Sequence, residues 1–327
     1  LNNAGANLGE SVAPAGDVNG DGYADMIIGA RIYGSGGAAA VYLGGPYSVN
    51  ATPSLTRTGG ATGNLLGSAV ANAGDINGDG YADALVGAPG ASNGQAGEGL
   101  AYVHYGSATG LSNAPSLTLE MNVAGAQFGA SVASAGDVNG DGYADVVVGA
   151  PLNGSGKAYV FLGSPAGLNP IPVSTLSGGA LFGSSVAGAG DVDADGYADV
   201  AVGAPGSGLA YVYNGGVAGI ATTPTITLSE PPASGQFGCA VATAGDVNGD
   251  GFSDLIVGAR LASNGQTNEG IAYVFKGGWL GITMPHIAQL EVNQANADLG
   301  VSVSGAGDVN GDGFSDVIVG ADLWDNG

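Results

Sequence analysis

Short apolar runs alternate with glycine-rich polar segments along the whole chain. Before each acidic segment stands an alternation of apolar and small residues, such as SVASAG at 131–136, and after it comes a β-branched run, such as DVVVGAP at 145–151. Both patterns are typical of strands. The recurring segments AAVYLG, AYVHYG, AYVFLG, AYVYNG and AYVFKG predict a third strand, and SLTL at 116–119, TITL at 225–228 and AQLEV at 288–292 predict a fourth. Because no window keeps a 3.6-residue apolar period, the pattern predicts an all-β protein.

The acidic segment is part of an internal repeat. GDVNGDGYADMIIGA at 16–30 recurs as GDINGDGYADALVGA, GDVNGDGYADVVVGA, GDVDADGYADVAVGA, GDVNGDGFSDLIVGA and GDVNGDGFSDVIVGA. Units of roughly 55 residues and four strands, with small residues at fixed places, favour the blades of a β-propeller over a sandwich or a solenoid. We therefore expect a single propeller over residues 1–327, with repeats at approximately 9–58, 67–120, 129–177, 183–229, 238–292 and, in part, 300–327.

The sixth repeat differs from the others in length. GADLWDNG at 320–327 aligns without a gap to GARLASNG at 258–265, so the sixth repeat is expected to stop after its second strand. An incomplete blade leaves unpaired strand edges, which proteins normally avoid. The complete assembly is expected to have six or seven blades. Either the sequence is a piece of a longer chain, or a neighbouring chain supplies the remaining strands.

Composition narrows the possible partners. The 327 residues include 65 Gly, and 28 acidic residues stand against 5 basic ones, for a net charge of −23. This balance argues against nucleic acid and anionic membranes, because a phosphate backbone requires Lys and Arg. The single cysteine, Cys239, excludes an internal disulfide and a Cys-rich zinc site. No stretch approaches the roughly 18 apolar residues of a membrane helix, and a start at Leu1 without a leader indicates a mature chain or a fragment.

The acidic loop has the residue pattern of a hard-cation site. In DVNGDGYAD, oxygen-bearing side chains fall at positions 1, 3, 5 and 9, and a glycine at position 6 allows a sharp bend. Ca²⁺ takes six to eight oxygen ligands, whereas Mg²⁺ requires a stricter octahedron. Position 12 is Ile or Val rather than the Glu of an EF-hand, so the loop should join two strands. The ligands expected in the first loop are Asp17, Asn19, Asp21, the backbone carbonyl of Tyr23, and Asp25.

The other five loops repeat this ligand pattern, so the sequence predicts up to six Ca²⁺ ions. Nineteen of the 28 acidic residues belong to the loops, and without metal these carboxylates would repel one another. We therefore expect calcium to stabilise the fold rather than to take part in a reaction. The remaining ligand sets are Asp75, Asn77, Asp79, Tyr81 and Asp83; Asp137, Asn139, Asp141, Tyr143 and Asp145; Asp191, Asp193, Asp195, Tyr197 and Asp199; Asp246, Asn248, Asp250, Phe252 and Asp254; and Asp308, Asn310, Asp312, Phe314 and Asp316.

Two short signatures flank every loop. Leu-Gly or Phe-Gly precedes the first strand at Leu8-Gly9, Leu66-Gly67, Phe128-Gly129, Phe182-Gly183, Phe237-Gly238 and Leu299-Gly300, and Gly-Ala follows the second strand. With the loops, these signatures resemble the FG-GAP repeats of integrin α-subunit head domains and of related bacterial and fungal propellers. The resemblance covers essentially the whole chain, although Arg31, Arg260 and Asp322 replace the signature proline in three repeats. It implies a calcium-bearing propeller, commonly of seven blades, used outside the cell in adhesion and ligand binding.

A few residues outside the loops are candidates for other roles. The aromatic residue at loop position 7 is expected to pack between adjacent blades rather than to form a recognition ring. Trp279 and Trp324 are the better candidates for exposed contacts. Glu98 and Glu269, in the longer connections at 92–103 and 263–274, are expected either to be solvated or to bind a ligand or ion. His104 and His286 have no matching Ser or Cys, so catalysis is not expected, and Cys239 is expected to be a small packed thiol.

These observations favour a noncatalytic adhesion or recognition module for protein or glycan, secreted or at the cell surface. The extracellular location follows from calcium, because sites with dissociation constants of about 10⁻⁴–10⁻³ M suit extracellular modules. One alternative is a structural, self-assembling protein, such as a filament or surface layer, that associates through its incomplete blade. A second alternative is a lectin or the noncatalytic part of a larger enzyme. Neither nucleic-acid binding nor membrane insertion is expected.

Overall fold

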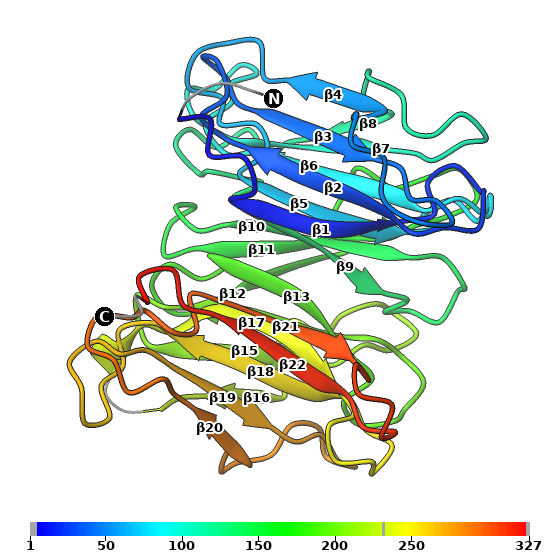
Figure 1. Ribbon diagram of the computed structural model, residues 1–327. Helices are drawn as coiled ribbons and strands as arrows, with labels where there is room; N and C mark the ends of the chain where they lie inside the picture. Colours follow the sequence, from blue (N-terminus) through cyan, green and yellow to red (C-terminus); the bar gives the residue numbers. More distant parts are fainter. Residues whose placement is uncertain (1–4, 231–232, 325–327) are drawn as a thin grey trace. The chain divides into compact units, whose positions relative to one another are not determined.

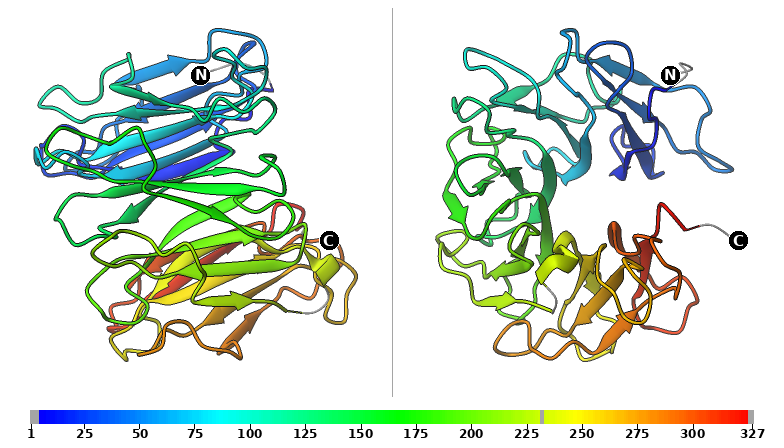
Figure 2. Two further views of the ribbon diagram at one scale, coloured as in Figure 1. Left: turned by 180° about the vertical axis from the view of Figure 1, so that it is seen from behind. Right: turned by 90° about the vertical axis from the view of Figure 1, so that its left-hand side faces the viewer.

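The computed structural model describes residues 5–230 and 233–324. Within these residues the chain forms five four-stranded antiparallel sheets and one two-stranded sheet. Figures 1 and 2 show these sheets as groups of arrows in which consecutive strands lie side by side. The only helical segment in the described ranges is a 3₁₀ turn, η1 (Ala233–Gly235). No helix among these residues has the length and apolar character needed to cross a membrane. The prediction of an all-β protein built from four-stranded units is confirmed.

Each four-stranded sheet contains strands that follow one another in the sequence. The first sheet contains β1 (Ser11–Gly16), β2 (Asp25–Ala30), β3 (Ala38–Tyr42) and β4 (Leu55–Thr58). The second contains β5 (Ala69–Gly74), β6 (Asp83–Ala88), β7 (Leu100–His104) and β8 (Leu117–Leu119), and the third contains β9 (Ser131–Gly136), β10 (Asp145–Ala150), β11 (Lys157–Phe161) and β12 (Ser174–Ser177).

The later sheets follow the same plan. The fourth contains β13 (Ser185–Gly190), β14 (Asp199–Ala204), β15 (Leu209–Tyr213) and β16 (Ile226–Leu228). The fifth contains β17 (Phe237–Gly245), β18 (Asp254–Ala259), β19 (Ile271–Phe275) and β20 (Ala288–Leu290). The sixth pairs β21 (Ser302–Gly307) with β22 (Asp316–Gly320), so within the described residues the sixth repeat has the two strands that the sequence predicts.

Burial explains why the second strands are continuous apolar runs. The six residues of β6, β10, β14 and β18 are buried along their whole length, because these strands lie inside a sheet and are covered on both faces. The fourth strands are short and partly exposed, as β8 and β16 show. An edge strand of three residues presents few unpaired backbone groups to other chains.

The chain divides into two compact units, each with its own apolar core. One unit comprises Leu1–Ser134, Asp141–Gly154 and Tyr159–Val173, and the other comprises Ala135–Gly140, Ser155–Ala158 and Ser174–Gly327, so the third sheet contributes strands to both. In the first unit, the Phe128 ring is buried edge-on against Phe161, at a centroid distance of 6.3 Å. In the second, Phe237 is buried against Phe275 in the same way, at 6.0 Å. The aromatic residue of the Phe-Gly signature is therefore a core residue of its blade.

The signature glycines mark places where two blades meet backbone to backbone. The Gly-Ala signature lies inside the second strand rather than after it, as Gly87 and Ala88 show at the end of β6. At Gly87 a Cβ atom would collide with the carbonyl oxygen of Gly129 in the next repeat. The same collision would occur at Gly29 with Gly67 and at Gly258 with Gly300. Gly87 has an ordinary backbone conformation, since its φ is not positive. A glycine is required there by the close approach of the neighbouring chain segment.

Candidate metal centres

The six acidic loops connect the first and second strands of their sheets. In the first loop the Asp17 carboxylate organises the backbone: Oδ1 accepts hydrogen bonds from the amides of Gly20 (2.7 Å) and Asp21 (3.1 Å), and Oδ2 accepts one from Gly22 (2.7 Å). Gly22 has a φ of 87°, which few other residues adopt easily. In repeats 2, 5 and 6, the carboxylates of Asp75, Asp246 and Asp308 accept the same three backbone bonds.

Positions 3 and 5 lie on the exposed side of the loop and fix the rest of its turn. Asn19 Oδ1 accepts a hydrogen bond from the Asp21 amide (3.1 Å), and Asp21 Oδ1 accepts one from the Tyr23 amide (3.0 Å). The Asn19 side-chain amide also donates to Asp21 Oδ2 (2.9 Å). These bonds bring the oxygen-bearing side chains of positions 1, 3 and 5 together at one edge of the loop. A carboxylate oxygen has more than one acceptor site, so these oxygens retain capacity for a cation.

The aspartate at position 9 lies in a different environment. Asp25 is buried, and its two oxygens accept hydrogen bonds from the amide of Val18 at loop position 2 (2.9 Å) and from that of Gly44 after β3 (2.8 Å). The corresponding aspartates of repeats 2, 4 and 5, which are Asp83, Asp199 and Asp254, make the same two bonds. This carboxylate therefore ties the loop to the turn that follows the third strand.

Burial changes the proton affinity of these inner carboxylates. Desolvation raises the pKa of Asp83 to about 6 and that of Asp199 to about 7, although two backbone amides bonded to each carboxylate act in the opposite direction. Desolvation also raises the pKa of Asp254. On the exposed side of the loop, hydrogen bonds outweigh desolvation. The amide of Gly313, with those of Gly311 and Asp312, lowers the pKa of the Asp308 carboxyl.

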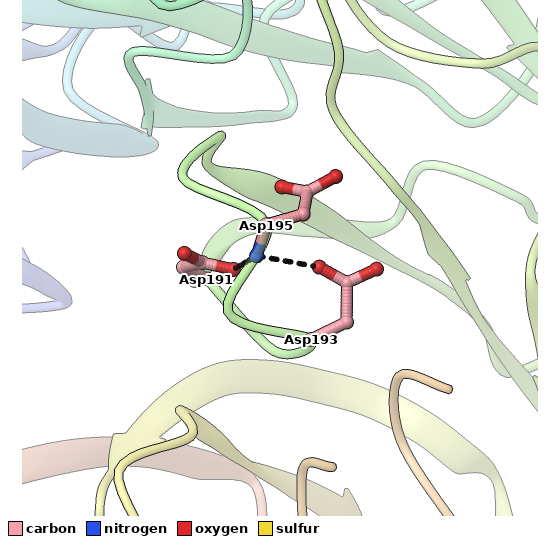
Figure 3. Close-up of side chains that lie close together, drawn as sticks. All are labelled: Asp191, Asp193 and Asp195. Carbon is pink, nitrogen blue, oxygen red and sulfur yellow. Dashed lines mark hydrogen bonds between the residues drawn. The ribbon is translucent and has the colours of Figure 1, made fainter. Parts of the chain in front are cut away.

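The fourth loop gathers the most negative charge. Asp191, Asp193 and Asp195 each have one carboxylate oxygen within 4.8 Å of those of the other two. Figure 3 shows the three side chains around the same loop. The Asp195 amide donates to both neighbours, at 3.1 Å to Asp191 and 3.3 Å to Asp193. Asn214 donates a further hydrogen bond to Asp193. Desolvation, followed by the nearby Asp195 charge, raises the pKa of Asp193.

This spacing fits a calcium ion. Calcium–oxygen distances are about 2.3–2.6 Å, so ligands on opposite sides of the ion are separated by about 5 Å. The three oxygens of the fourth loop lie within that span. In the other loops Asn takes the place of Asp193, and in the first, second, fifth and sixth loops this Asn accepts the same backbone bond. The residues present therefore fit the ion that the loop sequence predicts.

The loops also connect neighbouring blades within each unit. The Ala82 amide of the second loop donates to the Asp17 carbonyl of the first (2.9 Å), and the Ser107 amide after β7 donates to the Val18 carbonyl (3.1 Å). Equivalent bonds join Ser253 to Asp191 and Gly278 to Val192 in the second unit. Consecutive loops are thus fastened through their backbones.

The aromatic residue at position 7 packs against the preceding loop. A Cβ atom at Gly20 would lie 2.7 Å from Cε1 of Tyr81, and Gly78 has the same relation to Tyr143. In the second unit, Gly249 is covered by Phe314 in the same way. The prediction that these aromatic side chains pack between blades is confirmed at these positions.

Some functional positions were not singled out from the sequence. The glycines after each third strand, Gly44, Gly106, Gly163, Gly215 and Gly277, donate their amides to the position-9 aspartates. These glycines recur at the same place in every complete repeat, and this recurrence could have identified them from the sequence. A Cβ atom at Gly44 would collide with the Ala24 carbonyl oxygen, so the contact requires glycine.

The other candidates fall into two groups. Trp279 is highly exposed, with 80% of its surface accessible, and Trp324 is also exposed, whereas Cys239 is partly buried, with its thiol 3.3 Å from the Gly300 carbonyl oxygen. Glu98 and Glu269 are buried, so the expectation of solvated carboxylates is wrong. Each caps its own loop, because one carboxylate oxygen accepts backbone hydrogen bonds from it.

Comparison with known families gives one match that extends over most of the chain. The model of the FG-GAP repeat family matches residues 8–43, 66–104, 128–161, 182–220, 237–275 and 299–327. The chain is also 37% identical over 151 residues to integrin alpha-PS5 of Drosophila melanogaster, and 39% identical over 155 residues to integrin alpha-IIb of Mus musculus. These alignments cover 41% and 44% of this chain and 15% of each integrin subunit.

Solved structures share the fold at low sequence identity. A Bacteroides uniformis protein assigned as a 6-phosphogluconolactonase is 13% identical, with a TM-score of 0.56 over 87% of this chain and 72% of its own. The WD40 domain of Toxoplasma gondii coronin is 8% identical, with a TM-score of 0.50 over 90% of this chain and 63% of its own. WD40 repeats form propeller blades of four strands. With the repeat pattern, this likeness identifies the fold class as a β-propeller of four-stranded blades.

Proposed function

Because the chain belongs to the FG-GAP repeat family, we propose that it is an extracellular, calcium-stabilised recognition module that binds a protein ligand without catalysis. The observation that supports this proposal most directly is the repetition of one acidic loop in six repeats, fastened blade to blade. Millimolar calcium outside cells would fill sites with dissociation constants of about 10⁻⁴–10⁻³ M. The similarity to integrin α subunits is consistent with adhesion.

Within each loop, the ion would be held by the oxygens of positions 1, 3, 5 and 9 and by the carbonyl of position 7. In the first loop these are Asp17, Asn19, Asp21, Asp25 and the Tyr23 carbonyl. Bound calcium would supply positive charge that offsets the carboxylate repulsion and fixes the loop. The chain's own part is to hold these oxygens in place, which it does through the backbone bonds to Asp17 and Asp25.

The turns after the third strands offer a contact surface next to the loops. In the fifth repeat, Trp279 and Leu280 are 80% and 88% exposed. The same turn is anchored to two loops, by the Gly277 amide on Asp254 (2.8 Å) and by the Gly278 amide on the Val192 carbonyl (2.9 Å). Large apolar side chains on a fixed turn favour protein contacts, because tryptophan is enriched among the residues that dominate interface energies. Calcium would position this turn through the loops.

Neither histidine lies in an arrangement that favours catalysis. His104 is buried, with Nδ1 2.9 Å from the Ser112 carbonyl oxygen, and His286 Nδ1 lies 2.8 Å from Glu230 Oε1. Both imidazoles therefore serve contacts between neighbouring segments. This supports the noncatalytic part of the proposal.

The proposal is tested by binding of the whole chain to a panel of immobilised secreted and cell-surface proteins, in 2 mM calcium and in EDTA. We expect a calcium-dependent partner, and we expect the double variant Trp279→Ala/Leu280→Ala to bind it at least about tenfold more weakly. Leu323→Ala, an exposed apolar residue in the turn after β22, is the matched control and should bind normally. Binding that is equal in calcium and EDTA, or recognition of glycans alone, would contradict the proposal.

A further inference from the structure

Two glutamates outside the acidic loops are enclosed in the same way in two different repeats. Glu98 lies in the connection between β6 and β7, and Glu269 lies in the connection between β18 and β19. Their exposed fractions are 1% and 0%. Their backbone carbonyls accept the amides of Phe128 and Leu299, which begin the next repeats, at 2.9 and 3.0 Å. The side chains are therefore held at the start of a blade-to-blade contact.

Only one oxygen of each carboxylate has a partner. Glu98 Oε1 accepts hydrogen bonds from the amides of Asn93 and Gln95, and Glu269 Oε1 accepts the equivalent bonds from Asn264 and Gln266. Oε2 of Glu98 and Oε2 of Glu269 are buried and have no hydrogen-bond partner among the residues that the structure describes. A buried carboxylate oxygen without a partner is strongly unfavourable, because its hydration is lost without replacement.

A second carboxylate is bonded to the connection that holds each of these glutamates. The Asn93 side-chain amide donates to Glu120 Oε2 (2.7 Å), and the Asn264 side-chain amide donates to Glu291 Oε2 (2.8 Å). Asn93 and Asn264 thus each join two acidic residues, one through the backbone amide and one through the side chain. The ion pairs found among the described residues involve Glu10 and Glu230, so no basic side chain there offsets either buried glutamate.

The other repeats show that blade packing does not require this charge. The residue in the same position, whose carbonyl accepts the first amide of the next repeat, is Gly36 in the first repeat (2.8 Å) and Ser155 in the third (3.3 Å), both in shorter connections. Ser155 donates to the Gly178 carbonyl, and Ser207, which aligns with Glu98 in the sequence of the fourth repeat, accepts the Ala180 amide (2.7 Å), so both serines have neutral partners. The buried carboxylate therefore belongs to the longer connections of repeats 2 and 5.

We propose that Glu98 and Glu269 each bind a calcium ion through Oε2, at two sites separate from the six acidic loops. A buried carboxylate oxygen without a partner, with a second carboxylate bonded to the same asparagine, favours a divalent cation. An irregular loop rich in backbone carbonyls suits calcium, which accepts oxygen ligands in flexible geometry. Glu120 and Glu291 contribute negative charge at the edge of each site. Each ion fastens a long connection to the first residues of the next repeat. The proposal does not depend on calcium in the acidic loops.

The test is the number of calcium ions bound by the whole chain, measured by native mass spectrometry after equilibration in calcium. The double variant Glu98→Gln/Glu269→Gln preserves side-chain shape and removes the charge, and we expect it to bind two calcium ions fewer than the unaltered chain. Glu10→Gln, which alters a partly exposed glutamate paired with Arg31, is the matched control and should bind the same number. Circular dichroism establishes that each variant is folded.

A second measurement covers the case in which the double variant does not fold. Crystals of the unaltered chain soaked in Tb³⁺ should give anomalous peaks about 2.3–2.6 Å from Oε2 of Glu98 and of Glu269, the usual range of calcium–oxygen distances. Absence of these peaks, or an unchanged calcium number in the folded double variant, would overturn the proposal. Greater stability of that variant in both calcium and EDTA would do the same, because an ion bound by the glutamates should make the unaltered chain the more stable one in calcium. Asp17→Asn changes only an acidic loop. Its calcium number therefore tests the loop sites separately from the sites at Glu98 and Glu269.

Discussion

The same residue type takes two roles within a single loop, according to its surroundings. Asp308, at position 1, lies among backbone amides on the exposed side, and these amides lower the pKa of its carboxyl. Asp199, at position 9, is buried, and desolvation raises its pKa to about 7 despite two amide donors. The difference arises because hydrogen bonds favour the ionised form and loss of water disfavours it. A cation at the loop would favour ionisation of both.

The fourth loop provides a test of charge at the single-residue scale. Asp193→Asn removes one of its three clustered carboxylates, and we expect the calcium affinity of this loop to fall roughly tenfold, because ligand charge tunes affinity in such loops. The same variant should be more stable than the unaltered chain in EDTA, because the repulsion is reduced. Calorimetric titration and thermal melts measure the two effects. Asn77→Asp, the reverse change in repeat 2, should strengthen binding, and equal affinities in all three proteins would contradict this account.

His104 should make stability depend on pH. Burial, with the nearby Arg57 charge, lowers the pKa of this imidazole to about 4, although its bond to Ser112 acts in the opposite direction. The unfolded chain has a pKa near 6.5 and binds the proton more readily between these values, so stability falls as pH decreases from about 6.5 to 4. Between these pH values the free energy of unfolding of the unaltered chain should fall by about 2–3 kcal/mol more than that of His104→Gln. Denaturant unfolding in EDTA at several pH values measures it; parallel pH profiles would contradict the assignment.

At the scale of the element, the repeat signatures have separate structural reasons. The aromatic residue of Phe-Gly fills the core of its own blade, as Phe128 does against Phe161. The glycines allow backbone segments of two blades to approach, as at Gly87 and Gly129. The proline of Gly-Ala-Pro is replaced in three repeats, and the second strand is still formed there. The proline is therefore not required for the second strand.

The close approach predicts a large effect from one methyl group. Gly87→Ala should destabilise the fold by about 3 kcal/mol or more, because the added Cβ meets backbone rather than a flexible side chain. Gly45→Ala is the matched control: Gly45 has an ordinary φ, and a Cβ atom there would lie in ordinary contact, 3.4 Å from the Ser48 carbonyl oxygen, so we expect a change within about 0.5 kcal/mol. Equilibrium unfolding of both variants in calcium provides the comparison. Similar free energies of unfolding would show that the contact is looser than the structure indicates.

At the scale of the whole molecule, charge is concentrated where calcium would bind. Nineteen of the 28 acidic residues lie in the six loops, and six calcium ions would offset about half of the net charge of −23. Because the loops also join neighbouring blades within each unit, repulsion in the loops acts on the packing of blades. Calcium binding and folding should therefore be strongly coupled.

Removal of calcium should lower the melting temperature of the whole chain. At a calcium concentration about 100-fold above its dissociation constant, each site would add about 2.7 kcal/mol to the free energy of unfolding. With several such sites, we expect the melting temperature to decrease by on the order of 10 °C or more in EDTA. High salt should restore part of the stability by screening the carboxylates, and magnesium should restore less than calcium. Differential scanning calorimetry measures the shift. A melting temperature that is the same in EDTA and calcium would contradict calcium-dependent stability.

The sequence by itself determined the all-β class, the recurring four-stranded unit and the candidate calcium ligands, because these depend on local periodicity and on residue types at fixed spacing. Tertiary structure decided which oxygens are buried and what they contact. The Asp25 carboxylate meets the Gly44 amide, the Tyr81 ring covers the preceding loop, and Glu98 is enclosed rather than solvated. The first two contacts join residues distant in sequence, and the burial of Glu98 depends on the packing of neighbouring segments, which no single window of the chain contains.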